Sequence, residues 1–387
     1  MTVRATIYIA CLLLAMAACA QEAGPLPAAG GFTLSSDPAG ARVDVSPPGD
    51  PRFYVKGTTP CEVTVDQPRE GLWTVRVSLP GHLPAIMAGP LPSGELSVAL
   101  PPETLESLAQ CPLLIQTPDD PPAAVSRPPF SDEGQFRLEN AAAPVWSPTR
   151  ESVAHLRGGE VVLWSTAGER ALGPVAPDED VSAVPRVVFT PDGEYVASLL
   201  TRVGSADEPV TDIVLSCLPV GGGDRRTFPL GQIDRPAQVT DFAIDPTGQR
   251  VAVLLAPSGD AASAKPIAVY ALGGSRDPQY ASLAEGDPAP TAVAFDPSLP
   301  SLWTLLPADP EAQRPVIAVQ YLLDTGAIAR QAPPSGVEPY LRFDRLVFSP
   351  GGNWLAAAGE TPEGPRAVLL PWRELRDAYP VGMAAWI

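Results

Sequence analysis

The sequence predicts an all-β protein in which a small antiparallel β-sandwich is followed by a β-propeller. Six blades is the preferred count, with five or seven as alternatives. The chain has 387 residues, of which 49 are Pro and 33 are Gly without a Gly-X-Y period, a composition typical of many turns. Short stretches of alternating polar and apolar residues lie between these turns. From about residue 141 onward, one turn motif recurs five times at a spacing typical of propeller blades.

The first 20 residues have the pattern of a bacterial export signal. Arg4 supplies positive charge, and residues 5–18 form an uncharged, mostly apolar stretch. This stretch has the length of the apolar core of a signal peptide and is short for a membrane span. We therefore expect the chain to be exported and to work in the cell envelope, facing the periplasm or the cell surface.

The end of the signal allows two interpretations. Cleavage after Ala20 fits the small residues around it and would release a soluble chain. Residues 16–19, Met-Ala-Ala-Cys, instead resemble a bacterial lipobox, with Met16 where Leu is usual. This resemblance implies that Cys19 is lipidated and becomes the new N-terminus. We favour the lipid anchor, because a Gly/Ala/Pro-rich linker follows at residues 21–31.

Charge excludes one class of partner. The formal net charge is −18, so the surface repels phosphate backbones and we expect no nucleic-acid partner. It also repels anionic lipid headgroups, so attachment to a membrane depends on the anchor.

Three cysteines remain once the signal is removed and Cys19 is lipidated: Cys61, Cys111 and Cys217. Cys61 and Cys111 are a candidate disulfide in an oxidising compartment. The spacings follow no known disulfide framework, however, and the favoured interpretation is three buried thiols that act as small apolar side chains.

The alternation of polar and apolar residues in the segment 32–101 predicts the sandwich. Strands are expected at residues 32–34, 42–45, 74–77 and 96–100, where apolar residues alternate or cluster. Turn sequences rich in Pro and Gly separate them, at residues 38–41 and 80–81.

The motifs of this segment resemble those of a PEGA domain. They are Ser36-Asp37-Pro38-Ala39-Gly40-Ala41, Gly57-Thr58-Thr59-Pro60, Gly71-Leu72-Trp73-Thr74-Val75-Arg76-Val77 and Pro80-Gly81-His82. Ala39 stands where the family has Glu, and the stretch Pro47–Phe53 is longer than expected. The resemblance implies a noncatalytic envelope module. We expect structural roles for Trp73 and His82, since His82 has no second ligand at metal spacing.

The composition of residues 102–140 is typical of a linker. Within it, residues 113–116 could form a strand of a degenerate blade. Residues 141–387 carry the propeller repeats. The recurring prolines are at positions 148, 191, 246, 297 and 350, and each follows an apolar strand. Pro and Gly make the turn, a second apolar strand follows directly, and a third follows a polar loop. Residues 383–387 could supply a closing strand.

The Phe-Ser-Pro-Asp-Gly type of turn, over about residues 141–375, resembles the repeats of TolB-like and tryptophan-aspartate-type propellers. In such propellers ligands usually meet the loops around the central channel. The long variable loops here are at residues 201–211, 256–266, 307–315 and 360–365, and they are either ligand-binding loops or tolerated surface insertions.

No motif of a catalytic, cofactor-binding or metal site is present in the sequence. The two histidines, His82 and His155, lie in different predicted domains, and no nucleophile elbow, zinc motif or nucleotide-binding glycine motif occurs. The acidic run at residues 178–180 lacks the spacing of a calcium loop. We therefore expect no catalytic residue, no cofactor and no metal.

These observations favour a noncatalytic, envelope-anchored binding or scaffold protein. Its propeller would bind an envelope protein or a cell-wall component, while the lipid anchor holds the chain at a membrane. Two alternatives stay open: a propeller-type hydrolase or lyase acting on a glycan or lactone through loop carboxylates, and an accessory subunit of an envelope export or motility machine.

Overall fold

A computed structural model describes most of the chain. The described residues are 31–65, 69–104, 107, 113–116, 121–127, 136–178, 180–203, 211–233, 238–256, 266–274, 277–281, 283, 287–308, 314–331, 337, 340–372 and 379–383. Within these ranges we find no helix that is long and apolar enough to cross a membrane. The predicted signal peptide, Cys19 and Cys111 lie outside them.

The N-terminal domain is the predicted sandwich of two sheets. One sheet has the order β4 (Cys61–Val63), β1 (Phe32–Asp37), β7 (Gly94–Ala99). The other has the order β3 (Tyr54–Thr58), β2 (Arg42–Ser46), β5 (Trp73–Ser78), β6 (Ala85–Gly89). All pairs are antiparallel except β1 with β7, which is parallel, so the expected purely antiparallel arrangement is wrong at this one pair.

Alternation along the strands builds the sandwich core. Phe32 and Leu34 on β1 face Val43, Val45 and the apolar residues of β5, and all are buried. Trp73 is 4% exposed, and its indole N–H donates to the Arg69 carbonyl at 2.9 Å. The structural role expected for Trp73 is therefore confirmed.

The second domain consists of six sheets among the described residues, in agreement with the preferred count of six blades. We number them as blades 1 to 6. Blade 1 has three strands, β8 (Leu113–Gln116), β9 (Ala124–Arg127) and β10 (Arg137–Leu138). Blades 2 to 6 have four strands each. Blade 2 consists of β11 (Ala142–Trp146), β12 (Ser152–Arg157), β13 (Glu160–Ser165) and β14 (Gly168–Pro174), and blade 3 consists of β15 (Ser182–Phe189), β16 (Tyr195–Val203), β17 (Thr211–Pro219) and β18 (Arg226–Ile233). Blade 4 consists of β19 (Val239–Ile244), β20 (Arg250–Leu255), β21 (Ile267–Ala271) and β22 (Gln279–Ala281), blade 5 of β23 (Ala294–Phe295), β24 (Ser301–Leu306), β25 (Ile317–Leu322) and β26 (Ile328–Gln331), and blade 6 of β27 (Arg342–Phe348), β28 (Trp354–Thr361), β29 (Gly364–Pro371) and β30 (Tyr379–Met383).

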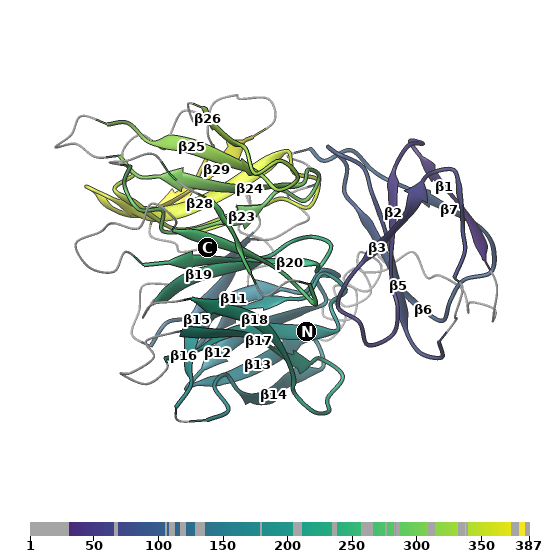
Figure 1. Cartoon of the computed structure of the whole chain (residues 1–387), viewed down its shortest axis with the longest axis horizontal. Helices are drawn as coiled ribbons and strands as arrows, with labels where there is room; N and C mark the ends of the chain where they lie inside the picture. The colour runs from purple at the N-terminus through teal and green to yellow at the C-terminus, as the bar shows by residue number, and fades with distance from the viewer. Residues whose placement is uncertain are drawn as a thin grey trace, which may run out of the picture.

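Consecutive blades pack through their inner strands. β8 contacts β11, and β11, β15, β19, β23 and β27 each contact the next in that order. Apolar side chains of neighbouring blades fill the space between the sheets, as in the buried cluster around Phe242 and Tyr270 that joins blades 3 and 4. This stacking of four-stranded antiparallel sheets around an axis is the predicted β-propeller, and the sandwich lies against one side of it (Figure 1).

The recurring turn motif has a structural explanation that blade 4 illustrates. The Asp245 carboxylate accepts hydrogen bonds from the Thr247 hydroxyl at 2.6 Å and from the backbone N–H groups of Gln249 at 2.8 Å and Arg250 at 3.0 Å. Gly248 has a φ of 69°, a left-handed conformation that Gly adopts without strain. The polar residue before Pro therefore caps the turn, and the Gly closes it.

The C-terminal strand β30 pairs with β29, since Met383 lies opposite Arg366. The described part of the C-terminus thus completes its own blade. Residues 384–387, the remainder of the candidate closing strand, lie outside the described residues.

Candidate functional site

The sandwich binds one face of the propeller through the stretch Pro47–Phe53, which we call the docking loop. The Phe53 N–H donates to the Thr247 carbonyl at 2.6 Å, and the Gln249 side-chain amide donates to the Phe53 carbonyl at 2.6 Å. A Cβ atom on Gly248 would lie 2.3 Å from a docking-loop carbonyl oxygen, so this contact requires glycine. The stretch Pro47–Phe53, whose length stands out in the sequence, is therefore the part that contacts blade 4.

Arg76 strengthens this contact from the centre of the sandwich sheet. Its guanidinium pairs with the buried Asp44 at 2.7 Å and donates to the Pro246 carbonyl of blade 4. It also stacks over the Phe53 ring at 4.5 Å. Burial lowers the pKa of Arg76, and the charge of Asp44 opposes that shift. Arg76 therefore joins the sandwich core, the docking loop and the propeller.

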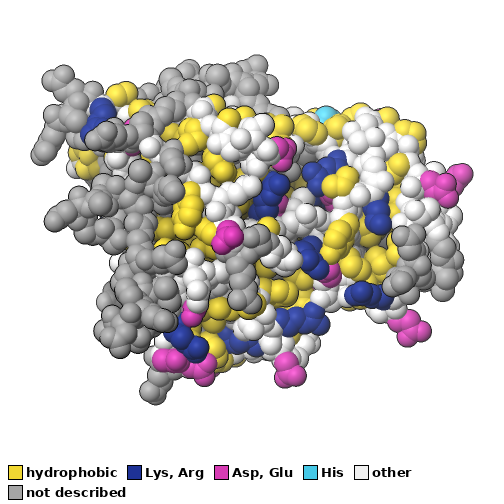
Figure 2. Space-filling model, in the orientation of Figure 1, with side chains coloured by type: hydrophobic (Ala, Val, Ile, Leu, Met, Phe, Trp, Pro, Cys, Tyr) yellow, Lys and Arg dark blue, Asp and Glu magenta, His cyan; other side chains and the backbone are white. Residues whose placement is uncertain are grey.

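Blade 3 makes the next contact, again at its turn. Arg226 donates to the carbonyl of Gly49 in the docking loop and lies 5.3 Å from the centre of the Tyr195 ring. The Glu194 carboxylate accepts the Gly49 N–H, and burial raises the pKa of Glu194. Figure 2 shows that Lys and Arg side chains gather where the two domains meet, although the chain as a whole is acidic.

Glu103, just beyond the sandwich, attaches the chain to blade 6. It is 5% exposed, and its carboxylate accepts from the N–H groups of Gly351 at 2.7 Å and Asn353 at 2.9 Å and from the Ser349 hydroxyl at 2.8 Å. The nearby Gly81 N–H donates to the Gly351 carbonyl at 3.0 Å. The predicted Pro-Gly-His turn is thus part of the interface. Its half-buried His82 forms a β-bridge with Pro102.

These contacts define two faces of the propeller. The sandwich touches the turns between first and second strands in blades 3, 4 and 6, and blades 3 and 6 are opposite each other in a six-blade ring. It therefore spans the end of the propeller axis on that side (Figure 1). Because each second strand runs away from this face, the connections between second and third strands begin at the other face, which we call the loop face. The candidate loops 201–211, 256–266, 307–315 and 360–365 are these connections, and large parts of the first three lie outside the described residues.

Three charged side chains meet at the propeller axis and form what we call the axial cluster: Arg186, Asp241 and Arg345. Arg186 on β15 donates to Oδ1 of Asp241 on β19, and Nη1 of Arg345 on β27 lies 3.5 Å from the same oxygen. The other oxygen, Oδ2, accepts the Val293 N–H at 3.1 Å. Since blade 5 separates β19 from β27, a contact between side chains of these inner strands has to lie at the axis.

Local irregularities in the strands help to place this cluster. The pairing of β15, β19 and β27 with their neighbours shifts register between Ala183 and Val187, between Val239 and Asp241, and between Phe343 and Arg345. A bulge of this kind turns a side chain away from the direction that strict alternation would give it. Sequence alternation alone therefore could not assign these residues to the axis.

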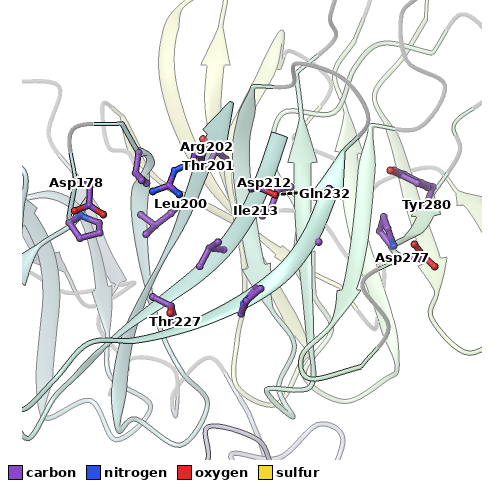
Figure 3. A pocket seen from close by; sticks show the side chains of 16 residues that line it. Asp178, Leu200, Thr201, Arg202, Asp212, Ile213, Thr227, Gln232, Asp277 and Tyr280 are labelled. Carbon is purple, nitrogen blue, oxygen red and sulfur yellow. Dashed lines mark hydrogen bonds between the residues drawn. The ribbon is translucent and has the colours of Figure 1, made fainter. Parts of the chain in front are cut away.

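A groove of about 600 Å³ lies along blade 3 and extends from the connection before β15 to β22 of blade 4 (Figure 3). Its polar lining includes Asp178, Asp212 and Asp277. The Gln232 amide donates to the Asp212 carboxylate at 2.8 Å. In Figure 3 the three carboxylates lie apart from one another along the groove and do not converge on one point.

His155 lies on β12, the second strand of blade 2, and is fully buried. Its Nε2 is 3.9 Å from Oε1 of Glu169. Burial lowers the pKa of His155, and the charge of Arg157 adds to this effect. His155 is therefore held in the interior of blade 2, on the strand next to the inner strand β11.

The cysteine predictions are tested only in part. Cys61 on β4 is a free, half-buried thiol, and its candidate partner Cys111 lies outside the described residues, so this disulfide stays a prediction. Cys217 is buried and free, and burial raises its pKa to about 12. The predicted lipidation site Cys19 also lies outside the described residues.

Metal ligands do not cluster in the part of the chain that the structure describes, where no group of three or more His, Cys, Asp or Glu side chains could hold an ion. From the predicted acidic run, Asp178 lines the groove and Asp180 pairs with Arg202 at 3.1 Å.

No protein-family model matches the chain, and no curated protein matches it. Similar solved structures include TolB from Acinetobacter baumannii, with 14% identity, a TM-score of 0.43 and coverage of 67% of this chain and 60% of that one. An oligogalacturonate lyase in complex with manganese has 13% identity, a TM-score of 0.47 and coverage of 72% and 74%. The Swd1 propeller domain from Myceliophteria thermophila has 15% identity, a TM-score of 0.40 and coverage of 67% and 80%. These likenesses concern the fold alone and carry no argument about function.

Proposed function

We propose that this chain is a noncatalytic, envelope-anchored scaffold whose propeller binds a protein or cell-wall partner at its loop face. The observation that carries the proposal is the docking of the sandwich across the opposite face. Buried polar contacts of Arg76 and Glu103 hold the two domains together, so the sandwich acts as a spacer in a fixed orientation. The sandwich therefore covers one face of the propeller, and the loop face is the one that a partner can bind.

The N-terminal signal and the PEGA-like motifs fit the same proposal. A lipid on Cys19 would tether the chain through the linker 21–31, which reaches at most about 45 Å to the first strand when fully extended. Counting outward from the membrane, the sandwich would then come first and the propeller second. The noncatalytic assignment is supported by the buried position of His155 and by the separated carboxylates of the groove.

Deleting a loop of the loop face tests the binding proposal. We expect that shortening the connection at residues 204–210 to a Gly-Ser turn reduces recovery of the envelope partner from detergent-solubilised membranes by about tenfold or more. The matched control shortens the exposed turn Gly221–Gly223 on the sandwich side of the same blade, which should leave recovery unchanged. Shortened variants of each of the other loop-face connections, studied in the same way, complete the test. Undiminished recovery with all of them would refute the proposal.

Replacing Cys19 tests the anchor. We expect Cys19→Ala to move the exported protein from the membrane fraction to the soluble fraction, because one acyl-bearing residue is the attachment and the acidic surface adds none. Cell fractionation followed by immunoblotting measures this. Cys11→Ala within the signal is the control and should leave the protein in the membrane fraction. If Cys19→Ala stays membrane-bound after cleavage of its signal, the lipid anchor is not what holds it.

A further inference from the structure

Arg345 has more hydrogen-bond donors than partners in the axial cluster. The one partner found for it among the described residues is Oδ1 of Asp241, at 3.5 Å, an oxygen that Arg186 already occupies. The other oxygen of Asp241 is taken by a backbone N–H. A guanidinium carries five N–H donors, so most donors of Arg345 have no acceptor among the described residues.

The charges of the cluster do not balance. Among the described residues of the cluster, Arg186 and Arg345 share the single negative charge of Asp241, which leaves one positive charge unpaired there. The nearest further acid on β27, Asp344, is paired with Arg342 at 2.8 Å. Burial together with the charge of Arg186 lowers the pKa of Arg345 to about 10, while the charges of Asp241 and Asp344 oppose this shift.

The side chain of Arg345 is partly exposed. It is 22% exposed, compared with 12% for Arg186 and 2% for Asp241. Arg345 is held on an inner strand, so this exposed part faces the axis. The sandwich spans the axis on one side, and a ligand would therefore approach from the loop face, where the proposed partner binds.

The chemistry of the cluster selects the ligand. A guanidinium fork matches a carboxylate in a two-bond geometry, and one surplus positive charge matches one carboxylate better than a phosphate with two negative charges. A sugar acid would also use an aromatic platform. Four inner-strand phenylalanines that the structure describes, Phe189, Phe242, Phe295 and Phe343, are at most 8% exposed, and the half-buried Phe348 packs edge-on against Trp372.

We propose that the propeller axis binds a carboxylate group of a protein partner, which pairs with Arg345 while Asp241 and Arg186 hold the surrounding charges in place. This inference rests on the proposed binding function and specifies its chemistry. The carboxylate could be the C-terminus of the partner or an Asp or Glu side chain in an extended segment, and the experiment separates these two sources.

Isothermal titration calorimetry on the chain without its signal peptide tests the inference with three kinds of probe. The first is a neutral hexapeptide with a free C-terminal carboxylate, compared with its C-terminal amide. The second is an amidated hexapeptide with an internal Glu, compared with its Gln counterpart. The third is trigalacturonate, a carboxylate-bearing sugar. We expect one of the two carboxylate peptides to bind and its neutral counterpart to bind about 10- to 100-fold more weakly.

Two variants assign the binding to Arg345. Arg345→Met should weaken binding of the carboxylate peptide to the level of the neutral peptide, whereas Arg345→Lys, which keeps the charge but loses the fork, should weaken it less. Arg137→Met on β10 of blade 1 is the control, since Arg137 is 48% exposed and pairs with Glu139, and it should bind like the wild type. Circular dichroism establishes that each variant is folded.

The inference is wrong if neither carboxylate peptide binds, or if one binds equally well to Arg345→Met. Binding of trigalacturonate alone, lost in Arg345→Met, would replace the protein partner with a glycan. The inference can fail while the proposed function stands. In that case the loop deletions abolish recovery of the envelope partner, but Arg345→Met leaves that recovery intact.

Discussion

Glu103→Ala is expected to destabilise the docking of the sandwich on the propeller by about 3 kcal/mol, because it leaves buried donors without an acceptor. The N–H groups of Gly351 and Asn353 lose their partner altogether. The Ser349 hydroxyl keeps a second acceptor, the Trp354 carbonyl at 3.2 Å, so its loss is smaller. Urea unfolding monitored by circular dichroism should change from one transition to two, with the sandwich unfolding first.

Glu95→Ala is the matched control for this prediction. Glu95 is an exposed glutamate on β7 of the same domain, and its removal should change stability by at most about 0.5 kcal/mol. Glu103→Gln should fall between the two, since it keeps one acceptor oxygen but places an NH2 group opposite a backbone donor. If Glu103→Ala unfolds like the wild type, the contact with blade 6 does not hold the domains together.

Asp241→Ala is expected to destabilise the propeller by about 4 kcal/mol. Removing one member of a buried ionic group leaves its partners uncompensated, and here two guanidinium groups would face each other at the axis. The Val293 N–H would also lose its acceptor. Denaturant unfolding followed by tryptophan fluorescence measures the loss, and Asp224→Ala, at an exposed position between β17 and β18, is the control.

A second substitution shows whether the loss arises from charge. In the double variant Asp241→Ala, Arg345→Met the repulsion between the two arginines is gone, so we expect recovery of about 1–2 kcal/mol relative to the sum of the single effects. Strictly additive effects would mean that Asp241 acts through packing or its backbone hydrogen bond, and not by compensating Arg345.

Much of the fold could be predicted from the sequence because it depends on local signals. The turns of the propeller repeats are capped by residues within a few positions of the turn, as with Asp245 and Gly248. The strands after each turn alternate or run apolar, and β8 falls at the predicted residues 113–116. Three strands of the sandwich, β3, β4 and β6, were not predicted: β3 begins directly after the stretch treated as an insertion, and Ala85–Gly89 has no alternation.

The axial cluster and the domain interface could not be predicted in the same way. Arg186, Asp241 and Arg345 are separated by 55 and 104 residues and meet only because the blades close around an axis. Glu103 contacts residues about 250 positions away. One signal in the sequence did lie at the interface: the stretch Pro47–Phe53 separates two predicted elements by more residues than expected, and it forms the docking loop.

The docking of the sandwich also breaks the equivalence of the blades. A ring of similar blades has approximate rotational symmetry, so its repeats could in principle be exchanged or shifted by one position. The turns of blades 3, 4 and 6 instead carry residues that contact the sandwich, such as Gln249 and Asn353. These contacts fix how the ring is rotated about its axis relative to the sandwich. The sandwich therefore assigns each blade a fixed position relative to itself. Inserting or deleting one whole blade would change which loops of the loop face lie on the side of the docking loop, even where every blade still folded.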